Sequence, residues 1–290
     1  MVMLMRCSFA EMTTTRMLSL APFLWHRVRI MEANVRNADS QRVQVVERAF
    51  ALLEVLAGLG GSATAGELKA ATGLAGPTVH RLLHTLMGVG VVHQLSDRRY
   101  ALGANLVPLG ESATRQLGGP AVPQMQALVA ELGESVNLAA MESEMIVYIG
   151  QVPSPHSMRM FTEVGRRAHL HSTGVGKALL AGMDPVRVRE ILGATGMPSL
   201  TEKTLTRPQA LLDQLPRIAA QGYALDDEEQ EMGVRCLAVV VPHGPSPMGL
   251  SVSGPTGRMH DGFVRHAVPL MRRTAVEIGR RMSRLSPRRG

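Results

Sequence analysis

The chain has 290 residues, which is enough for two domains of ordinary size. Its composition, 45% hydrophobic and 19% charged, is that of a globular protein, and no apolar run approaches the roughly 18 residues that a membrane span needs. The two cysteines, Cys7 and Cys236, match no metal-binding or redox spacing, so we expect a reducing compartment, the cytoplasm, with no cofactor and no membrane partner.

The net charge of +7 is concentrated at one end of the chain. Residues 262–290 carry eight arginines and one glutamate, whereas residues 104–261 carry twelve basic and sixteen acidic side chains. Residues 41–103 hold six basic and four acidic side chains. The charge therefore reports a basic C-terminal end, with a basic tail over 285–290, and is weak evidence for nucleic-acid binding.

Residues 1–40 show no persistent helical or strand pattern, and six of the 19 methionines fall at positions 1, 3, 5, 12, 17 and 31. A disordered arm, a targeting peptide and upstream sequence translated in frame are the competing interpretations. The apolar stretch Leu18–Trp25 is a poor match for a secretory signal, which needs a compact apolar core and a small-residue cleavage site. We favour a start at Met31 and a disordered extension over residues 1–40.

A helical stripe of apolar residues begins at Val45 and stops at three glycines. Its members are Val45, Val46, Ala49, Leu52, Leu53 and Leu56, and the glycines are Gly58, Gly60 and Gly61. We expect this first helix to be buried against two others.

The next stretch has the pattern of a helix-turn-helix. Thr64 and Glu67 have the spacing of a capping box, and Gly73 is suited to a left-handed helix stop. Pro77 then opens a second helix, where a missing N–H costs nothing. One stripe of this helix is apolar: Val79, Leu82, Leu83 and Leu86. The outer face is polar: Thr78, His80, Arg81, His84 and Thr85. Two short helices in this arrangement are typical of DNA-binding proteins.

A hairpin follows the second helix. Residues 91–95 and 99–102 are β-prone and are separated by the turn Ser96-Asp97-Arg98. A hairpin in this place is the wing of a winged helix, and Arg98 and Arg99 at its tip suit contacts with phosphate or the minor groove. The alternative is a small helical packing unit with a solvated hairpin.

The rest of the chain alternates helices and strands. A helix is expected over Asn105–Leu117, with Leu106, Leu109 and Ala113 facing inward, before the boundary at Gly118-Gly119-Pro120. Further helices are expected from Pro123 to Gly133, over Gly174–Ala181 and at the basic end. Two more are expected to start at Asp184-Pro185 and Thr206-Arg207-Pro208, where Asp184 and Thr206 are the expected N-caps. Strands are expected over Ser135–Met141, Met145–Val152, Met158–Val164, Tyr223–Asp226, Cys236–Pro242 and Gly249–Ser253. This order predicts an α+β domain with a largely antiparallel sheet.

Several stretches resemble the IclR family of bacterial transcriptional regulators, in the family's order. They are TVHRLLHTL with RRYALG, GESVNLAAMESEMIVYIGQV, GRRAHLHSTGVGKALLA, LTRPQALLDQLPRIAAQGYALDDEEQEMGVRCLAVVVP and LSVSGP. The resemblance covers nearly the whole chain beyond residue 40. It implies a DNA-binding winged helix, a linker helix and a GAF-like domain that binds a small effector. It also implies homodimers, often paired into homotetramers, that repress or activate neighbouring operons.

The expected organisation follows from these patterns. A disordered extension covers 1–40, the winged helix 41–103, the linker helix 104–119, the GAF-like effector domain 120–284 and the basic tail 285–290. One departure concerns the recognition helix: the family commonly has Pro-Lys-Ser where this chain has Ala75-Gly76-Pro77, so contacts of the lysine and serine do not carry over. The expected contacts with duplex operator DNA are Thr78, His80, Arg81, His84, Arg98 and Arg99. For His80 and His84, a solvated face is an equal alternative.

The expected effector site combines a helix start with a serine-bearing strand. The resemblance places Gly174 and Val175, with Met160, Asp226, Cys236, Ser251 and Ser253, around one pocket. On a strand Ser251 and Ser253 share a face, and free amides at Gly174 and Val175 could receive a carboxylate. We therefore expect a small organic acid, and a hydroxy- or keto-acid because Asp226 would repel a simple anion.

Other functions for these residues have less support in the sequence. Gly174-Val175-Gly176-Lys177 fails as a P-loop, because His171 holds the first glycine position and Ala178 follows the lysine. Cys236 is by default an inert core residue, and a zinc site with Asp226 and a nearby histidine has no ligand spacing behind it. The remaining alternative to a regulator is an enzyme with Cys236 as nucleophile and His169 or His171 as base.

Overall fold

The computed structural model describes residues 43–160 and 162–285. The extension predicted over 1–40, the start at Met31 and all but the first residue of the predicted basic tail lie outside these residues. The chain divides between Gly110 and Glu111 into two compact parts, unit 1 and unit 2.

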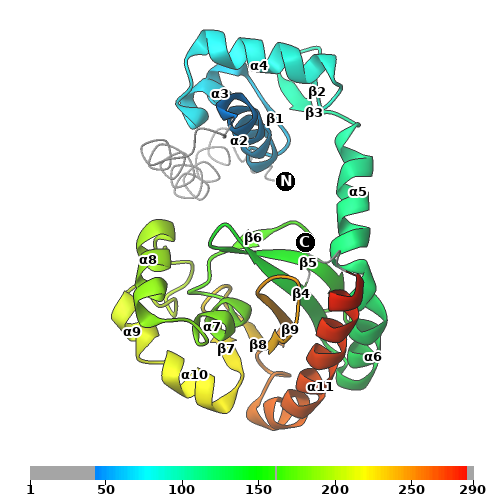
Figure 1. Ribbon diagram of the computed structural model, residues 1–290, viewed down its shortest axis with the longest axis vertical. Helices are drawn as coiled ribbons and strands as arrows, with labels where there is room; N and C mark the ends of the chain where they lie inside the picture. Colours follow the sequence, from blue (N-terminus) through cyan, green and yellow to red (C-terminus); the bar gives the residue numbers. More distant parts are fainter. Residues whose placement is uncertain (1–42, 161, 286–290) are drawn as a thin grey trace, which may run out of the picture. The chain divides into compact units, whose positions relative to one another are not determined.

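The described part of unit 1 contains three helices before α5 and a small antiparallel sheet, as the helix-turn-helix and wing patterns predict (Figure 1). The helices are α2 (Gln44–Gly58), α3 (Ala65–Thr72) and α4 (Gly76–Gly88). The strands are β1 (Ser62–Ala63), β2 (Val92–Gln94) and β3 (Tyr100–Leu102), in the order β1-β3-β2. The predicted stripe of α4 is buried in the core of this unit: Val79, Leu82, Leu83 and Leu86.

The start of α3 confirms the predicted capping box. The Thr64 hydroxyl accepts from the N–H of Glu67 at 3.2 Å, and the Glu67 carboxylate accepts from the N–H of Thr64 at 2.7 Å. Gly73 ends the helix in the left-handed conformation, with φ 68°. Two of the four orphan N–H groups at the helix start are thereby satisfied.

The predicted burial of the first helical stripe is wrong at its beginning. Leu52, Val55 and Leu56 are buried, but Val45 and Val46 are 53% and 50% exposed. The part of the stripe that packs against the core of unit 1 begins at Ala49, so Val45 and Val46 precede it. Phe50, 63% exposed, lies four residues after Val46 on the same side of the helix.

Helix α5 (Leu106–Leu117) contains the boundary between the units. The sequence predicts an inward face with Leu106, Leu109 and Ala113, but α5 has no buried residue, and Leu109 is 63% exposed. The helix is amphipathic, yet no described element packs on its apolar side. The prediction of an inward face is therefore wrong for the single chain.

Unit 2 is an α+β domain around one antiparallel sheet, as predicted. The strand order is β6-β5-β4-β9-β8-β7, and every neighbouring pair is antiparallel. The strands are β4 (Ser135–Glu142), β5 (Met145–Val152), β6 (Arg167–Ala168), β7 (Ala224–Asp227), β8 (Val234–Val241) and β9 (Met248–Pro255).

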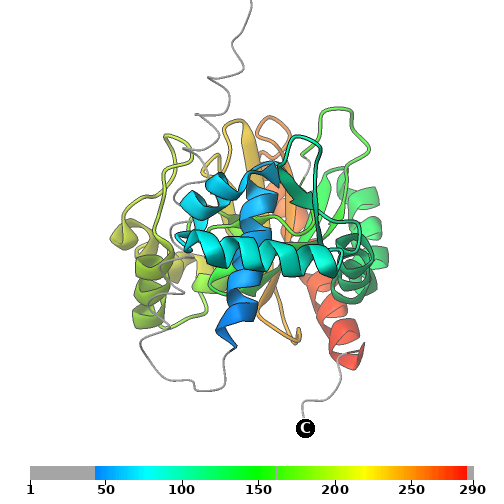
Figure 2. The same cartoon turned by 90° about the horizontal axis from the view of Figure 1, so that it is seen from above.

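Helices cover both faces of this sheet (Figure 1 and Figure 2). On one face α6 (Val122–Leu132) and α11 (Asp261–Leu285) bury Leu138, Val239 and their neighbours. The other face is covered by α7 (Gly174–Leu180), α8 (Pro185–Thr195), α9 (Pro208–Leu212) and α10 (Leu215–Gln221). Small residues such as Ala224 and Ala238 line that second face, so α7 approaches the sheet closely. Among the described helices none is long and apolar enough to cross a membrane.

Two local predictions in unit 2 are wrong. The segment predicted as a strand over Met158–Val164 contains no strand among its described residues, and the edge strand is Arg167–Ala168 instead. Asp184 caps α8 by accepting from the N–H of Val186 at 2.7 Å, as expected, but the cap residue of α9 is Arg207 rather than Thr206. A proline at the first helical position restricts the residue before it, whichever side chain that residue carries.

Candidate functional site

The polar face of α4 is open to solvent. His80, Arg81 and His84 are exposed and Thr78 is half-buried, while the opposite stripe of the helix lies in the core. The Thr85 hydroxyl donates back to the Arg81 carbonyl oxygen at 2.9 Å, so it is already partnered within the helix. The arrangement presents two imidazoles and one guanidinium on one surface, the side-chain types that contact base edges and phosphates.

The wing turn exposes one of its two arginines. Arg98 is exposed at the tip and adopts φ 65°, in the left-handed region. Its carbonyl oxygen accepts from Gln94 Nε2 at 3.3 Å, and the Asp97 carboxylate accepts from the N–H of Arg99 at 3.0 Å. These bonds hold the turn through its backbone, and the Arg98 guanidinium has no ion-pair partner within the described residues.

Arg99 points back into unit 1. Its Nη2 donates to the Ser62 carbonyl oxygen at 2.9 Å and lies 3.2 Å from Glu67 Oε2. The N–H of Thr64 and the Arg99 guanidinium both stabilise the Glu67 carboxylate and lower its pKa. The structure therefore separates the two arginines that the sequence groups together: Arg98 faces solvent and Arg99 ties the wing to α3.

In unit 2, the seven residues expected around an effector line a single cavity of about 30 Å³. They are Met160, Gly174, Val175, Asp226, Cys236, Ser251 and Ser253. The cavity lies between the N-terminus of α7, strands β7, β8 and β9, and the segments that follow β5 and β7. Residues from six places in the sequence thus meet at one point of unit 2.

The sheet supplies a polar floor to this cavity. Asp226, Cys236 and Ser253 are paired in register across β7, β8 and β9, and Ser135 of β4 continues the row. Asn137 Nδ2 donates to the Ser253 hydroxyl at 3.2 Å. Because alternate residues of a strand share a face, Ser251 lies on the same side of the sheet. The floor therefore offers hydroxyls, a thiol and a carboxyl group within a few ångströms.

Helix α7 forms the opposite wall. The Thr173 hydroxyl caps it by accepting from the N–H of Gly176 at 3.1 Å. By helix geometry the N–H groups of Gly174 and Val175 have no acceptor inside the helix. A Cβ at Gly174 would lie 3.2 Å from the Ala238 Cβ, so glycine is needed for this close approach to the sheet. Amide donors are consequently held beside the polar floor.

Two groups on the floor have perturbed pKa values. Burial raises the pKa of Asp226 to about 6, although the N–H groups of Glu229 and Gln230 that donate to its carboxylate act in the opposite direction. Burial, and then the neighbouring Asp226 carboxylate, raise the pKa of the Cys236 thiol. At neutral pH the thiol is therefore protonated, and Asp226 can exchange a proton with a bound molecule.

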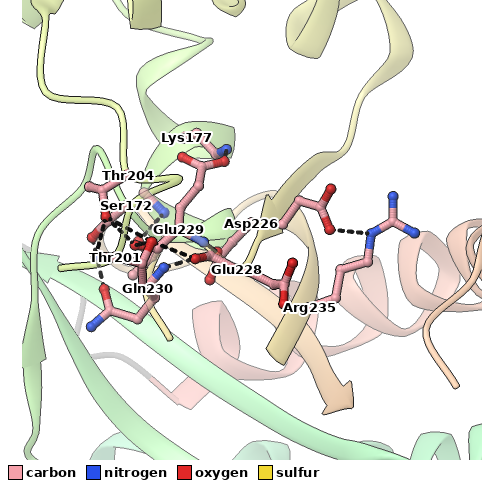
Figure 3. Close-up of polar contacts among 12 residues, drawn as sticks. Ser172, Lys177, Thr201, Thr204, Asp226, Glu228, Glu229, Gln230 and Arg235 are labelled. Atoms are coloured by element: carbon pink, nitrogen blue, oxygen red, sulfur yellow. Dashed lines mark hydrogen bonds and ion pairs between the residues drawn. The ribbon is translucent and has the colours of Figure 1, made fainter. Parts of the chain in front are cut away.

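A network of buried polar contacts joins α7 to the segment that follows β7 (Figure 3). Lys177 of α7 is 1% exposed and forms an ion pair with Glu229, which is 7% exposed. The Glu229 carbonyl oxygen accepts from the Thr204 hydroxyl at 2.6 Å, and the Ser172 hydroxyl donates to Gln230 Oε1 at 2.8 Å. The segment after β7 is thus fastened to α7 and to the loop that precedes α9.

Sequence reasoning did not assign eight further lining residues to the site, although all but Thr162 stand within the stretches that resemble the family. The additional members are Tyr148, Thr162, Arg166, Ala168, Thr173, Gln230, Glu231 and Val234. Arg166 is exposed and brings a cation to the cavity, which suits an anionic ligand. Burial raises the pKa of Tyr148, which therefore stays a neutral hydroxyl. The GRRAHLHSTG motif contains Arg166, but only the folded chain shows that it reaches the cavity.

The histidines near this site have other partners. His171 is fully buried, its Nε2 lies 3.1 Å from the Pro198 carbonyl oxygen, and burial lowers its pKa. Its ring packs edge-on against His169, with centroids 5.3 Å apart. No group of three or more His, Cys, Asp or Glu side chains within the described ranges is arranged to hold a metal ion.

Two family profiles match the chain. The IclR helix-turn-helix domain matches residues 45–96, and the bacterial transcriptional regulator IclR C-terminal domain matches residues 114–280. The sequence is 34% identical over 244 residues to the transcriptional repressor IclR of Escherichia coli K12, an alignment that covers 82% of this chain and 89% of that protein.

Solved structures share the fold. An IclR transcriptional regulator from Alicyclobacillus acidocaldarius has a TM-score of 0.73 at 24% identity, over 83% of this chain and 99% of the other. An IclR homolog from Microbacterium hydrocarbonoxydans, complexed with 4-hydroxybenzoate, has a TM-score of 0.68 at 24% identity, over 83% of this chain and 100% of the other.

Proposed function

The chain belongs to the IclR family of bacterial transcriptional regulators, and we propose that a small organic acid bound in unit 2 modulates its binding to operator DNA. One observation carries the effector half of this proposal: seven residues expected from separate motifs line a single cavity, together with a cation at Arg166. We expect repression, as in the repressor of Escherichia coli named above. The proposed site of action is the cytoplasm, where the DNA is.

For DNA we propose that α4 enters the major groove and that Arg98 contacts the backbone from the wing. Thr78, His80, Arg81 and His84 are the side chains of α4 available for base and phosphate contacts. We leave Arg99 out of this set, because its guanidinium is engaged with Glu67 and Ser62.

We propose that the chain acts as a homodimer, alone or paired into a homotetramer. Apolar side chains that no described element covers support association: Phe50 on α2 and Val107 and Leu109 on α5 are each about 60% exposed. A surface of this kind is costly in a monomer and usually lies in an interface. Two copies also double the base contacts, as a single recognition helix reads only a few base pairs.

The proposed effector is a hydroxylated or keto carboxylic acid. The amides of Gly174 and Val175 and the Arg166 guanidinium would receive its carboxylate, and Asp226, with a pKa near 6, would meet its hydroxyl or carbonyl group. A hydroxyl donates to the ionised carboxylate, and a carbonyl accepts from the protonated one. One protein of the same fold was crystallised with 4-hydroxybenzoate, which is a hydroxylated acid.

A Cys236-dependent enzyme is the second candidate, and less supports it. A nucleophilic cysteine needs a lowered pKa, whereas burial raises the pKa of this thiol. The side chains that hydrogen-bond to Cys236 are Ser253 and Asp226, while the ring of His171 binds the Pro198 carbonyl oxygen.

A two-part experiment tests the proposed function. The full chain is first footprinted on the intergenic DNA beside its own gene, and we expect protection of a pseudo-palindromic site. A panel of hydroxy, keto and simple carboxylic acids is then screened by thermal shift, where a ligand at 100 times its dissociation constant stabilises by about 2.7 kcal/mol. Absence of any protected site refutes the DNA half, and a panel without a stabilising acid refutes the effector half.

A further inference from the structure

The loop between β7 and β8, residues 228–233, is the wall of the cavity that covers Asp226. We call it the lid loop. Its Glu229 and Gln230 N–H groups donate to Asp226 Oδ1 at 2.8 and 3.2 Å, and Gln230 and Glu231 line the cavity themselves. The loop starts with Glu228 in the left-handed region, at φ 63°. It is therefore a tight turn folded over the buried carboxyl group.

The cavity has to widen before an organic acid can enter. Its volume of about 30 Å³ is small beside the 300 Å³ or more of a usual ligand pocket. Helix α7 is unable to retreat easily, because all of its residues are buried and it packs in one core cluster with α8, α9 and α10. The floor of the cavity is held in place by the pairing of neighbouring strands of the sheet.

The lid loop is held differently. Glu231, Met232 and Gly233 are exposed, and Met232 is 49% exposed, so the outer half of the loop has little apolar packing. Its attachments are polar, and the most deeply buried of them is the ion pair between Glu229 Oε1 and Lys177 Nζ (Figure 3). The second ion pair of the lid loop, between Glu228 and Lys203, is closer to the surface. An element held by hydrogen bonds and two ion pairs opens at lower cost than a packed helix or a paired strand.

The ion pair of Glu229 with Lys177 is incompletely satisfied. Glu229 Oε2 is buried and makes no hydrogen bond to the rest of the described chain. Burying two charges costs desolvation energy that their attraction only partly returns, so a buried pair with an unpaired oxygen adds little net stability. Breaking it by removing one partner is expensive, since the other charge stays buried. A contact of this kind holds a position more than it stabilises the fold.

We propose that the Lys177–Glu229 ion pair is a clasp that holds the lid loop closed over the cavity, and that ligand entry requires the clasp to open. Lys177 and Glu229 are then positioning residues, because neither lines the cavity and both act through α7 and the lid loop. The inference rests on the proposed effector site. The Thr201 hydroxyl donates to the Glu228 carbonyl oxygen, and the Thr204 hydroxyl donates to the Glu229 carbonyl oxygen. The loop that carries these two threonines is therefore attached to the lid loop and moves with it.

The thiol of Cys236, on the cavity floor, reports on the lid without any ligand. In the full chain with Cys7→Ser, Cys236 is the only thiol, and its alkylation by iodoacetamide is followed by mass spectrometry. We expect slow labelling of the parent and at least about tenfold faster labelling of Lys177→Met and of Glu229→Gln. A change in the thiol pKa would have opposite signs in the two variants, because loss of the Lys177 cation raises it and loss of the Glu229 carboxylate lowers it. Faster labelling of both variants therefore reports access.

The control is Arg187→Gln, which removes an exposed ion pair with Glu144 and Glu190 in the same unit and is expected to leave labelling unchanged. Local opening of the lid exposes little surface, so the faster rate should hardly respond to low urea concentrations. An unchanged rate in both variants overturns the clasp. So does a faster rate with the full urea dependence of global unfolding, which means that the pair only stabilises the fold. The assay uses neither DNA nor effector, so it fails or succeeds independently of the proposed function.

Discussion

The guanidinium of Arg99 lies 3.2 Å from the carboxylate of Glu67, which joins the second strand of the wing to the first turn of α3. Glu67 also closes the capping box with Thr64, so one carboxylate serves the helix start and the wing. The orientation of the wing is therefore linked to the helix that precedes the recognition helix. This relationship divides the wing into a structural arginine and an exposed one.

Thr64→Ala should lower the free energy of unfolding by about 1 kcal/mol, because alanine at the N-cap leaves the N–H of Glu67 without its acceptor. Urea unfolding of the full chain, followed by circular dichroism, measures the change. Thr85→Ala is the matched control, since that exposed hydroxyl only donates back to the Arg81 carbonyl oxygen, and its removal should change stability by less than about 0.5 kcal/mol. Equal losses of unfolding free energy in the two variants would show that the capping box adds no more stability than the Thr85 hydrogen bond.

Arg98→Ala should reduce the salt dependence of operator binding, whereas Arg99→Ala should not. If Arg98 neutralises one phosphate, the slope of log K against log salt falls in magnitude by about 0.9 for each copy bound. Arg99→Ala should instead lower the stability of unit 1, as its contacts are with Glu67 and Ser62. Fluorescence anisotropy with a labelled operator from low to moderate salt gives both slopes. A reduced salt slope in Arg99→Ala, together with the parental slope in Arg98→Ala, would contradict this assignment.

The helices of unit 1 were predictable because their signals are local. The capping box, the glycine stop and the stripe from Val79 to Leu86 are each complete within one or two turns of the chain. Periodicity fails at Val45 and Leu109 for a physical reason. It identifies an apolar face, but whether another element covers that face depends on what lies beside it in space. Val45 precedes the covered part of its stripe, and Leu109 belongs to a face that no described neighbour covers.

The pocket was predictable only where the family resemblance assigns a residue to it. The resemblance supplied Asp226, Cys236, Ser251 and Ser253, and the two-residue period of a strand adds that the two serines share a face. Arg166 and Gln230 stand in loops, where no period relates sequence to direction. The ion pair of Lys177 with Glu229 joins residues 52 positions apart. Such a contact depends on how β7 and α7 pack, which local patterns do not encode.

Asp226→Asn should change how stability depends on pH. The folded-state pKa of Asp226 is about 6 and its ordinary value is 3.8, so the folded chain binds this proton more tightly than the unfolded chain. The stability that this tighter proton binding contributes is fully present below pH 3.8, and it is lost as the pH rises through 6. Asparagine stays neutral and lacks this loss, so relative to the parent the variant should gain about 2 kcal/mol between pH 4 and pH 7. Urea unfolding across this range measures the gain, and parallel curves would mean that Asp226 titrates normally.

Ser251→Ala is the sharpest test of the pocket floor. The Ser251 hydroxyl lines the cavity and makes no hydrogen bond to other described residues, so its removal strands no protein group. Ser253 accepts from Asn137, and Ser253→Ala therefore leaves a buried amide without its acceptor. For an acid found in the thermal-shift screen, we expect Ser251→Ala to weaken binding by about 1–3 kcal/mol without changing the free energy of unfolding.

Ser253→Ala should weaken both binding and folding, which separates a ligand contact from a structural one. Titration calorimetry with the acid and urea unfolding of each variant give the two quantities. Effector-free operator affinity should stay at the parental value in Ser251→Ala, because the change is confined to unit 2. If Ser251→Ala binds the acid normally and its operator complex still responds, the acid does not contact the Ser251 hydroxyl, and the floor of this cavity is not the effector site.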